Sequence, residues 1–224
     1  MRTYHCISML FNTIRRFFNR PIPFFEKKVS NFAHQKTKGT MLSLGSYKSY
    51  LENLVKRNSS NIFLNGGIDY ASVFITLLLN NVQKNMNMFC EGLNPEIMER
   101  PDVFDAFKGA IERGVEFNIL VEKKDYMENN PFRFAMEHSN VKIRCARPED
   151  LNTIDNVLGP GRCNFSVCDD KMVRLEVKPS EYKAVGSFNK PDWAGALNSL
   201  FEKSFVGAEP VQYHNNGSRK PLSL

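Results

Sequence analysis

The chain has 224 residues, of which 42% are hydrophobic and 24% charged, so it can form one well-buried globular domain with an extension. Its formal net charge is +6, but residues 1–40 contain eight Lys and Arg and one Glu, and residues 41–224 carry a net charge of −1. This balance excludes a basic groove for duplex DNA that runs over the whole domain and leaves only a local patch open.

The cysteines and histidines are scattered along the chain, and no Cys-x-x-Cys pair occurs. Cys163 and Cys168 are five residues apart, so on a strand they face opposite sides and cannot share a metal ion. We therefore expect no metal and no other cofactor, and free thiols in a reducing cytoplasm. The longest apolar stretch, Ala71–Leu79, is too short to span a membrane.

Residues 1–40 form a basic, amphipathic N-terminal extension. Apolar residues recur there at helical spacing: Ile7, Leu10, Phe11, Ile14 and Phe18. Pro21 and Pro23 end any such helix. Three interpretations are open: a helix over residues 1–20 that contacts an anionic membrane surface, a helix that docks on a partner protein, or translation from a start codon upstream of Met41.

The predicted elements of the first half alternate between helices and strands. Residues 41–59 are a helical lead-in, and the following segments predict, in order, a short apolar strand within 58–66, a buried helix over 68–84, a strand over 86–89, a helix over 101–113 and a strand over 115–121. The helix over 101–113 has typical boundaries, because its first turn contains Asp102 and Asp105 and Gly114 follows its end.

The second half ends in a predicted hairpin. Its elements are a helix over 131–138, a strand over 141–146, strands over 162–168 and 172–177 joined by an Asp169-Asp170 turn, a strand over 182–188 and a helix over 192–205. Residues 207–224 are polar and rich in Gly, Pro and Asn, which predicts a flexible tail. Alternation followed by a hairpin implies an α/β domain with a mixed sheet.

Residues 86–122 resemble the opening of a phospholipase D half-domain, in which a strand precedes a helix of the form ALxxAxxRGVxVxIL. The matching positions here are Ala106, Ala110, Arg113, Gly114, Val115, Ile119 and Leu120. The resemblance covers about residues 60–206 and implies a phospholipase D-like mixed sheet flanked by helices, preceded by an N-terminal helical extension. Single half-domains of this superfamily pair, so the resemblance also implies a homodimer.

Catalysis in this superfamily uses H-x-K, four residues, D, six residues and then G-S-x-N, with the histidine as nucleophile and the lysine and asparagine around the phosphoryl oxygens. When Asp169 is placed on the motif's aspartate, Arg162 stands at the nucleophile and Asn164 at the lysine. Arginine stays protonated and cannot be that nucleophile. The resemblance thus implies a catalytically degenerate member.

Gly186–Asn189 reads GSFN and matches G-S-x-N, but sixteen residues separate it from Asp169 instead of six. We interpret it as the family's terminal strand, which leaves Glu176 at the motif's glycine.

The hairpin carries the candidate site. One interpretation is a phosphate-binding site built from Arg162, Asn164, Lys171 and Arg174, with Glu176 orienting an arginine. The catalytic candidates are Asp169, Arg174 and Glu176. The other interpretation is an exposed ion pair on the hairpin, which contributes little to stability.

Three functions follow as hypotheses. The first is a degenerate phospholipase D-like protein that binds a phosphodiester, in a nucleic acid or nucleotide, or a partner protein, in a bacterial defence context that the resemblance implies. The second is an active, divergent phosphodiesterase or nuclease with a site that does not use histidine. The third is a membrane-surface adaptor that acts through residues 1–20.

Overall fold

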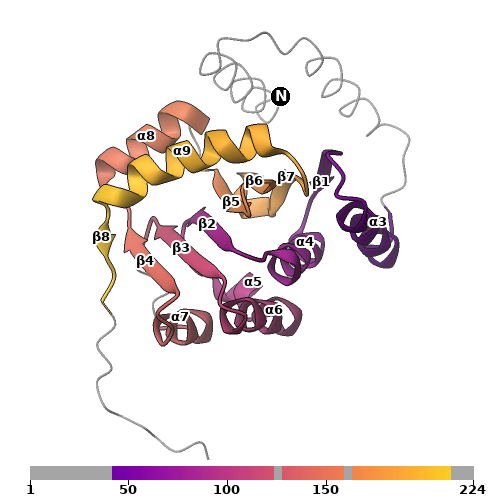
Figure 1. Cartoon of the computed structure of the whole chain (residues 1–224), viewed down its shortest axis with the longest axis horizontal. Helices are drawn as coiled ribbons and strands as arrows, with labels where there is room; N and C mark the ends of the chain where they lie inside the picture. The colour runs from indigo at the N-terminus through magenta and orange to yellow at the C-terminus, as the bar shows by residue number, and fades with distance from the viewer. Residues whose placement is uncertain (1–41, 124–127, 159–162, 213–224) are drawn as a thin grey trace, which may run out of the picture.

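The computed structural model describes residues 42–123, 128–158 and 163–212 (Figure 1). The predicted N-terminal helix, Arg162 and most of the predicted tail lie outside these residues. Within the described part of the chain, no helix has both the length and the apolar character needed to cross a bilayer.

An eight-stranded sheet in the order β1-β7-β6-β5-β2-β3-β4-β8 forms the centre of the described structure. Its strands are β1 (Phe63–Asn65), β2 (Asn85–Cys90), β3 (Glu116–Val121), β4 (Val141–Cys145), β5 (Asn164–Cys168), β6 (Met172–Lys178), β7 (Lys183–Ser187) and β8 (Glu209–Pro210). Strands β2, β3 and β4 are parallel, and the other pairings are antiparallel. The predicted α/β fold with a mixed sheet is confirmed.

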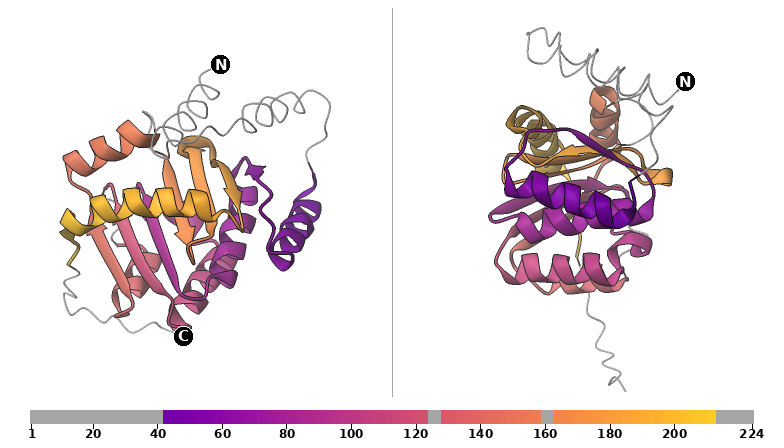
Figure 2. Two further views of the ribbon diagram at one scale, coloured as in Figure 1. Left: turned by 45° about the horizontal axis from the view of Figure 1, so that its top comes forward. Right: turned by 90° about the vertical axis from the view of Figure 1, so that its right-hand side faces the viewer.

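Helices cover both faces of the sheet (Figures 1 and 2). One face carries α4 (Ile68–Asn81), α5 (Pro95–Met98), α6 (Pro101–Glu112) and α7 (Asn130–Met136), and the other carries α8 (Pro148–Leu158) and α9 (Pro191–Gly207). The remaining helix, α3 (Leu44–Lys56), packs against α4. Each face of the sheet therefore has its own apolar core.

The hairpin of β5 and β6 turns at Asp169 and Asp170, as the sequence predicted. Their φ angles of 50° and 55° lie in the left-handed region that Asp tolerates, within a three-residue loop between the last paired residues of the two strands. The Asp169 carboxylate also accepts hydrogen bonds from the backbone N–H groups of Gln83, Lys84 and Asn85. One side chain thus ties the hairpin tip to the start of β2.

Two elements differ from the sequence expectation. Helix α8 lies in a stretch for which no element was predicted, although Pro148 at its first turn and Glu149 after it are typical of a helix start. Strand β8 lies in the segment predicted to be a flexible tail, where Glu209 and Pro210 pair with β4. Val211 is buried behind it, so packing against the sheet holds this segment.

Candidate ligand-binding site

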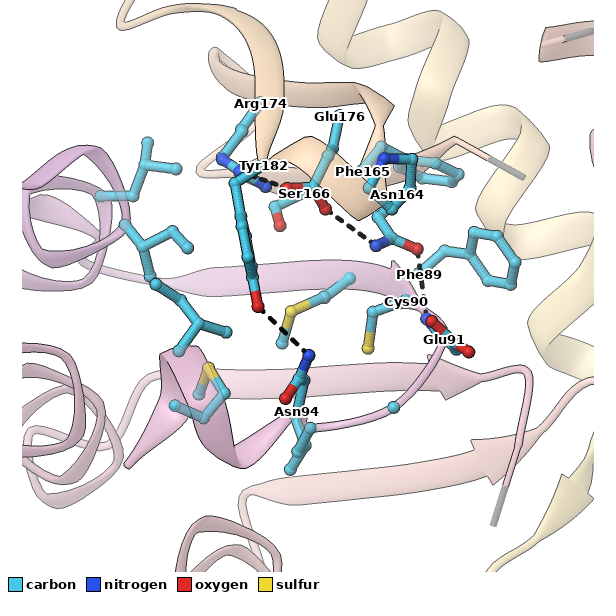
Figure 3. Close-up of a pocket in the computed structure, with 18 of the residues that line it drawn as sticks. Phe89, Cys90, Glu91, Asn94, Asn164, Phe165, Ser166, Arg174, Glu176 and Tyr182 are labelled. Carbon is cyan, nitrogen blue, oxygen red and sulfur yellow. Dashed lines mark hydrogen bonds and ion pairs between the residues drawn. The ribbon is translucent and has the colours of Figure 1, made fainter. Parts of the chain in front are cut away.

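A cavity of about 290 Å³ lies between the sheet and the helices α4, α5 and α6 (Figure 3). Its walls come from β2, β5, β6 and the segment after β6, so residues far apart in the sequence meet there. The apolar part of its lining includes Ile75, Leu78, Leu79, Met86, Met88, Phe89, Leu93, Ile97, Met98 and Phe107.

Four polar side chains on two neighbouring strands form one wall of the cavity: Asn164, Ser166, Arg174 and Glu176. In the β5–β6 pairing, Asn164 lies opposite Glu176. Ser166 lies opposite Arg174. Because side chains alternate along a strand, these four share one face, while the intervening residues pack in the core beneath α9.

A hydrogen-bonded network joins three of these side chains (Figure 3). Arg174 Nη2 donates to Glu176 Oε1 at 2.8 Å, and Asn164 Nδ2 donates to Glu176 Oε2 at 2.8 Å. The Asn164 Oδ1 atom in turn accepts from the backbone N–H of Glu91 at 3.1 Å. Both Glu176 oxygens and the Asn164 amide are thereby held in fixed positions.

The ion pair of this network is buried, with the Arg174 and Glu176 side chains only 6% and 7% exposed. The interpretation as an exposed surface pair is therefore wrong, because α4 and α5 cover this face of the hairpin. Arg174 Nε is buried and has no hydrogen-bond partner among the described residues. A buried donor without a partner is costly, and few native structures carry many of them.

Tyr182 stands at the cavity wall directly after β6 and the short 3₁₀ turn Pro179–Glu181. Its hydroxyl donates to Glu96 Oε2 at 2.7 Å and accepts from Asn94 Nδ2 at 3.4 Å. Its φ of 49° is uncommon for a residue with a large side chain. Burial and the Glu96 carboxylate raise the pKa of the Tyr182 phenol, so it is protonated at neutral pH.

Strand β2 contributes sulfur atoms to the cavity through Met86, Met88 and Cys90, which alternate onto the same face. Burial, together with the nearby Glu176 carboxylate, raises the pKa of the Cys90 thiol to about 12. At neutral pH Cys90 is therefore a thiol and not a reactive thiolate. No group of His, Cys, Asp and Glu side chains within the described residues is arranged to hold a metal ion.

No protein-family model matches this chain, and no curated protein matches its sequence. Among solved structures, NucT from Helicobacter pylori is 11% identical, with a TM-score of 0.50 over 67% of this chain and 99% of NucT. Nuc from Salmonella typhimurium, a phospholipase D family member, is 13% identical, with a TM-score of 0.49 over 68% of this chain and all of Nuc. The archaeal chromatin protein TrmBL2 is 14% identical, with a TM-score of 0.48 over 84% of this chain and 66% of TrmBL2.

The chain has a phospholipase D-like fold. The family resemblance seen in the sequence is thus confirmed at the level of the fold.

Asn164 and Glu176, which the sequence motif predicts at the positions of the family's lysine and glycine, are hydrogen-bonded to each other. The predicted site residues separate into two groups. Asn164, Arg174 and Glu176 meet in the cavity. Asp169 and Lys171 lie at the opposite end of the hairpin, and Arg162 lies outside the described residues.

The G-S-x-N look-alike does not line the cavity. Gly186 lies in β7 beneath Phe74, and a Cβ atom there would stand 2.3 Å from the Phe74 ring. Ser187 is fully buried, and Asn189 Nδ2 donates to the Asn58 carbonyl. These positions favour the interpretation of the tetrapeptide as a terminal strand whose glycine allows helix α4 to approach the sheet.

The sequence did not identify Tyr182, Asn94, Glu96 and Glu91 as residues of the site. No motif marks them, because they reach the cavity through the docking of α5 and the turn after β6. Met86, Met88 and Cys90 could have been grouped from their alternation in β2. His138 does not line the cavity, and its Nδ1 contacts the Phe134 carbonyl at the end of α7.

Proposed function

We propose that this chain is a non-hydrolytic phospholipase D-like protein whose cavity binds a ligand. The observation that carries the proposal is the network of Asn164, Glu176 and Arg174, in which the side chains at the motif positions bind each other. In an active site, such groups must be available to a phosphoryl group.

The chemistry of the remaining cavity residues supports the absence of hydrolysis. A covalent nucleophile has to be activated by a base or by a lowered pKa. The pKa shifts of Cys90 and Tyr182 have the opposite direction, because burial favours their protonated forms. Glu176 is engaged by two donors and is not free to act as a general base.

The contacts of the cavity residues give little support to the recognition of a phosphodiester. Arg174 is already paired with a carboxylate, and the Glu96 carboxylate of the lining would repel an anion. Lys171 lies in the hairpin turn, three residues before Arg174 and roughly 10 Å from it, and does not line the cavity. These contacts favour a ligand other than the phosphate group that the sequence suggested.

Hydrolysis of bis(p-nitrophenyl) phosphate and of single- and double-stranded DNA tests this proposal. We expect the purified full chain to give no turnover above that of a buffer blank. An activity that copurifies with the wild-type chain and disappears in the Arg174→Ala variant would overturn the proposal and favour the divergent phosphodiesterase.

A further inference from the structure

We propose that the cavity takes a small uncharged organic molecule that has a hydrogen-bond acceptor next to an apolar body. This inference rests on the proposed non-hydrolytic function and names its ligand class. It follows from the balance of charges in the lining, from one buried donor without a partner and from the character of the apolar wall.

The charges of the lining disfavour an anionic ligand. Arg174 is neutralised by Glu176 at 2.8 Å, and the Glu91 carboxylate at the rim is paired with Lys123 at 2.5 Å. The remaining carboxylate, Glu96, accepts a hydrogen bond from the Tyr182 hydroxyl. Among the residues that the structure describes, the lining therefore has no uncompensated positive charge, and its one charge without an ion pair, Glu96, is negative.

The inner wall disfavours a ligand that can only donate hydrogen bonds. Arg174 Nε is buried without a partner among the described residues, and it can only donate. Because Arg174 lines the cavity, a small rotation of its side chain would turn this N–H towards a ligand oxygen, which could then accept from it and remove the cost of leaving the donor unpaired. Ser166 lies opposite Arg174 on β5, and its hydroxyl can either donate to the same ligand or accept from it.

The rest of the cavity suits an apolar body. Its wall includes Met88, Met98 and Cys90, whose polarizable side chains adapt to irregular shapes, and Phe107. With a volume of about 290 Å³, the cavity lies at the lower end of the range for small-molecule sites. Polar groups that converge on one side of an apolar cavity orient the ligand and give its specificity.

Three probes of nearly identical shape and different charge test the inference: benzamide, benzamidine and benzoate. Benzamide is uncharged and has a carbonyl acceptor, benzamidine is a cation with donors only, and benzoate is an anion. We expect benzamide to bind the full chain at least about tenfold more tightly than either charged probe in calorimetric or NMR titrations. Benzamidine would leave the buried donor unpaired, and benzoate would bring a negative charge to a lining without a free positive charge among the described residues.

A spectroscopic readout places the probe in the cavity. The side-chain ¹⁵Nε–¹Hε resonance of Arg174 should shift on titration with benzamide, because the new acceptor contacts this N–H. The resonance is assigned by its absence in Arg174→Lys, a variant that keeps the positive charge beside Glu176 but removes the guanidinium. Arg147→Lys is the matched control, because Arg147 pairs with Asp150 at α8 on the other face of the sheet.

We expect Arg174→Lys to lose the preference for benzamide and Arg147→Lys to keep it. Should Arg174→Lys not fold, the Arg174 resonance is assigned by triple-resonance experiments on the wild-type chain, and its shift decides the question. Tighter binding of benzamidine or benzoate, or no binding of benzamide at about 10 mM, would overturn the inference, because weak ligands of this size bind at about the millimolar level. Phosphodiester hydrolysis is a separate readout and would overturn only the proposed function.

Discussion

At the scale of single residues, Arg174 and Glu176 are buried charges that depend on each other. The removal of one partner leaves the other charge buried and unpaired. We expect Glu176→Leu to lower the free energy of unfolding by about 3–5 kcal/mol. Urea denaturation measures this change.

The double variant Arg174→Met with Glu176→Leu is the control, because it removes both charges and keeps the volume. We expect it to be about as stable as the wild type, since well-packed apolar residues can replace a buried ion pair. If both variants lose the same stability, the cost comes from packing and not from the unpaired charge.

The thiol of Cys90 predicts a pH dependence of stability. Its pKa is raised to about 12 in the folded state from an ordinary value near 9, so folding favours the protonated form. The stability that the protonated thiol contributes is fully present below pH 9 and is lost as the pH rises towards 12. Between these values, each unit of rising pH lowers the free energy of unfolding by up to about 1.4 kcal/mol.

Denaturation curves of the wild type and of Cys90→Ala at several pH values from 8 to 11 check this expectation. The variant should lose less stability as the pH rises. Parallel curves for the two proteins would show that Cys90 does not titrate with a raised pKa.

At the scale of elements, the β5–β6 pairing brings Asn164, Arg174 and Glu176 of the predicted site together in the wall of the cavity. The sequence could not show that this face is buried, because burial depends on the docking of α4 and α5 from another part of the chain. The turn at Asp169 was predictable because its conformation is a local property. Tyr182 was not predictable as a site residue, since its contacts with Glu96 and Asn94 are tertiary.

The hairpin tip offers a test that separates stability from ligand binding. Asp169 accepts several backbone hydrogen bonds, and bonds to a charged group contribute about 1.5–3 kcal/mol each. We expect Asp169→Ala to lower the free energy of unfolding by about 2 kcal/mol or more. Asp169→Asn should lose less, because one oxygen still accepts and Asn tolerates the left-handed conformation.

Binding of benzamide to a folded Asp169→Ala variant should be unchanged, because Asp169 does not line the cavity. A selective loss of binding at the same stability would show that Asp169 acts on the site and not only on the turn.

The packing of α4 on the sheet predicts different effects at two glycines. Gly186→Ala places a methyl group 2.3 Å from the Phe74 ring, so we expect a loss of about 1–3 kcal/mol in the free energy of unfolding. Gly195→Ala in α9 meets no atom within 4 Å and should stabilise the chain by up to about 1 kcal/mol. Thermal and urea denaturation measure both, and a neutral Gly186→Ala would contradict the close approach of α4.

At the scale of the whole molecule, the charge is divided between a basic extension and a balanced domain. Residues 1–40 carry a charge of +7, so we expect any salt-sensitive binding to anionic vesicles or nucleic acid to depend on them. Vesicle flotation and DNA titration with the full chain and with residues 41–224 test this expectation. Equal binding by both forms would place the affinity in the phospholipase D-like domain.

The oligomeric state is a second property of the whole molecule. Pairing of two copies stays a prediction from the family resemblance. Sedimentation equilibrium of the full chain should give the mass of a dimer, about twice 25.7 kDa. A monomer at micromolar concentration would contradict it.

The position of β1 has a consequence for how the molecule forms. Strand β1 (Phe63–Asn65) pairs with Ala184–Gly186 of β7, so one of the earliest described strands can pair only after one of the last has been synthesised. Contacts of such long sequence separation form slowly, since a long loop must close before they can contribute. Strand β6, which carries Arg174 and Glu176, pairs with β7 on the side opposite to β1. The last residue that lines the cavity, Tyr182, is therefore made only when most of the domain has been synthesised, and a chain shortened before β7 would leave β6 as an unpaired edge of the sheet.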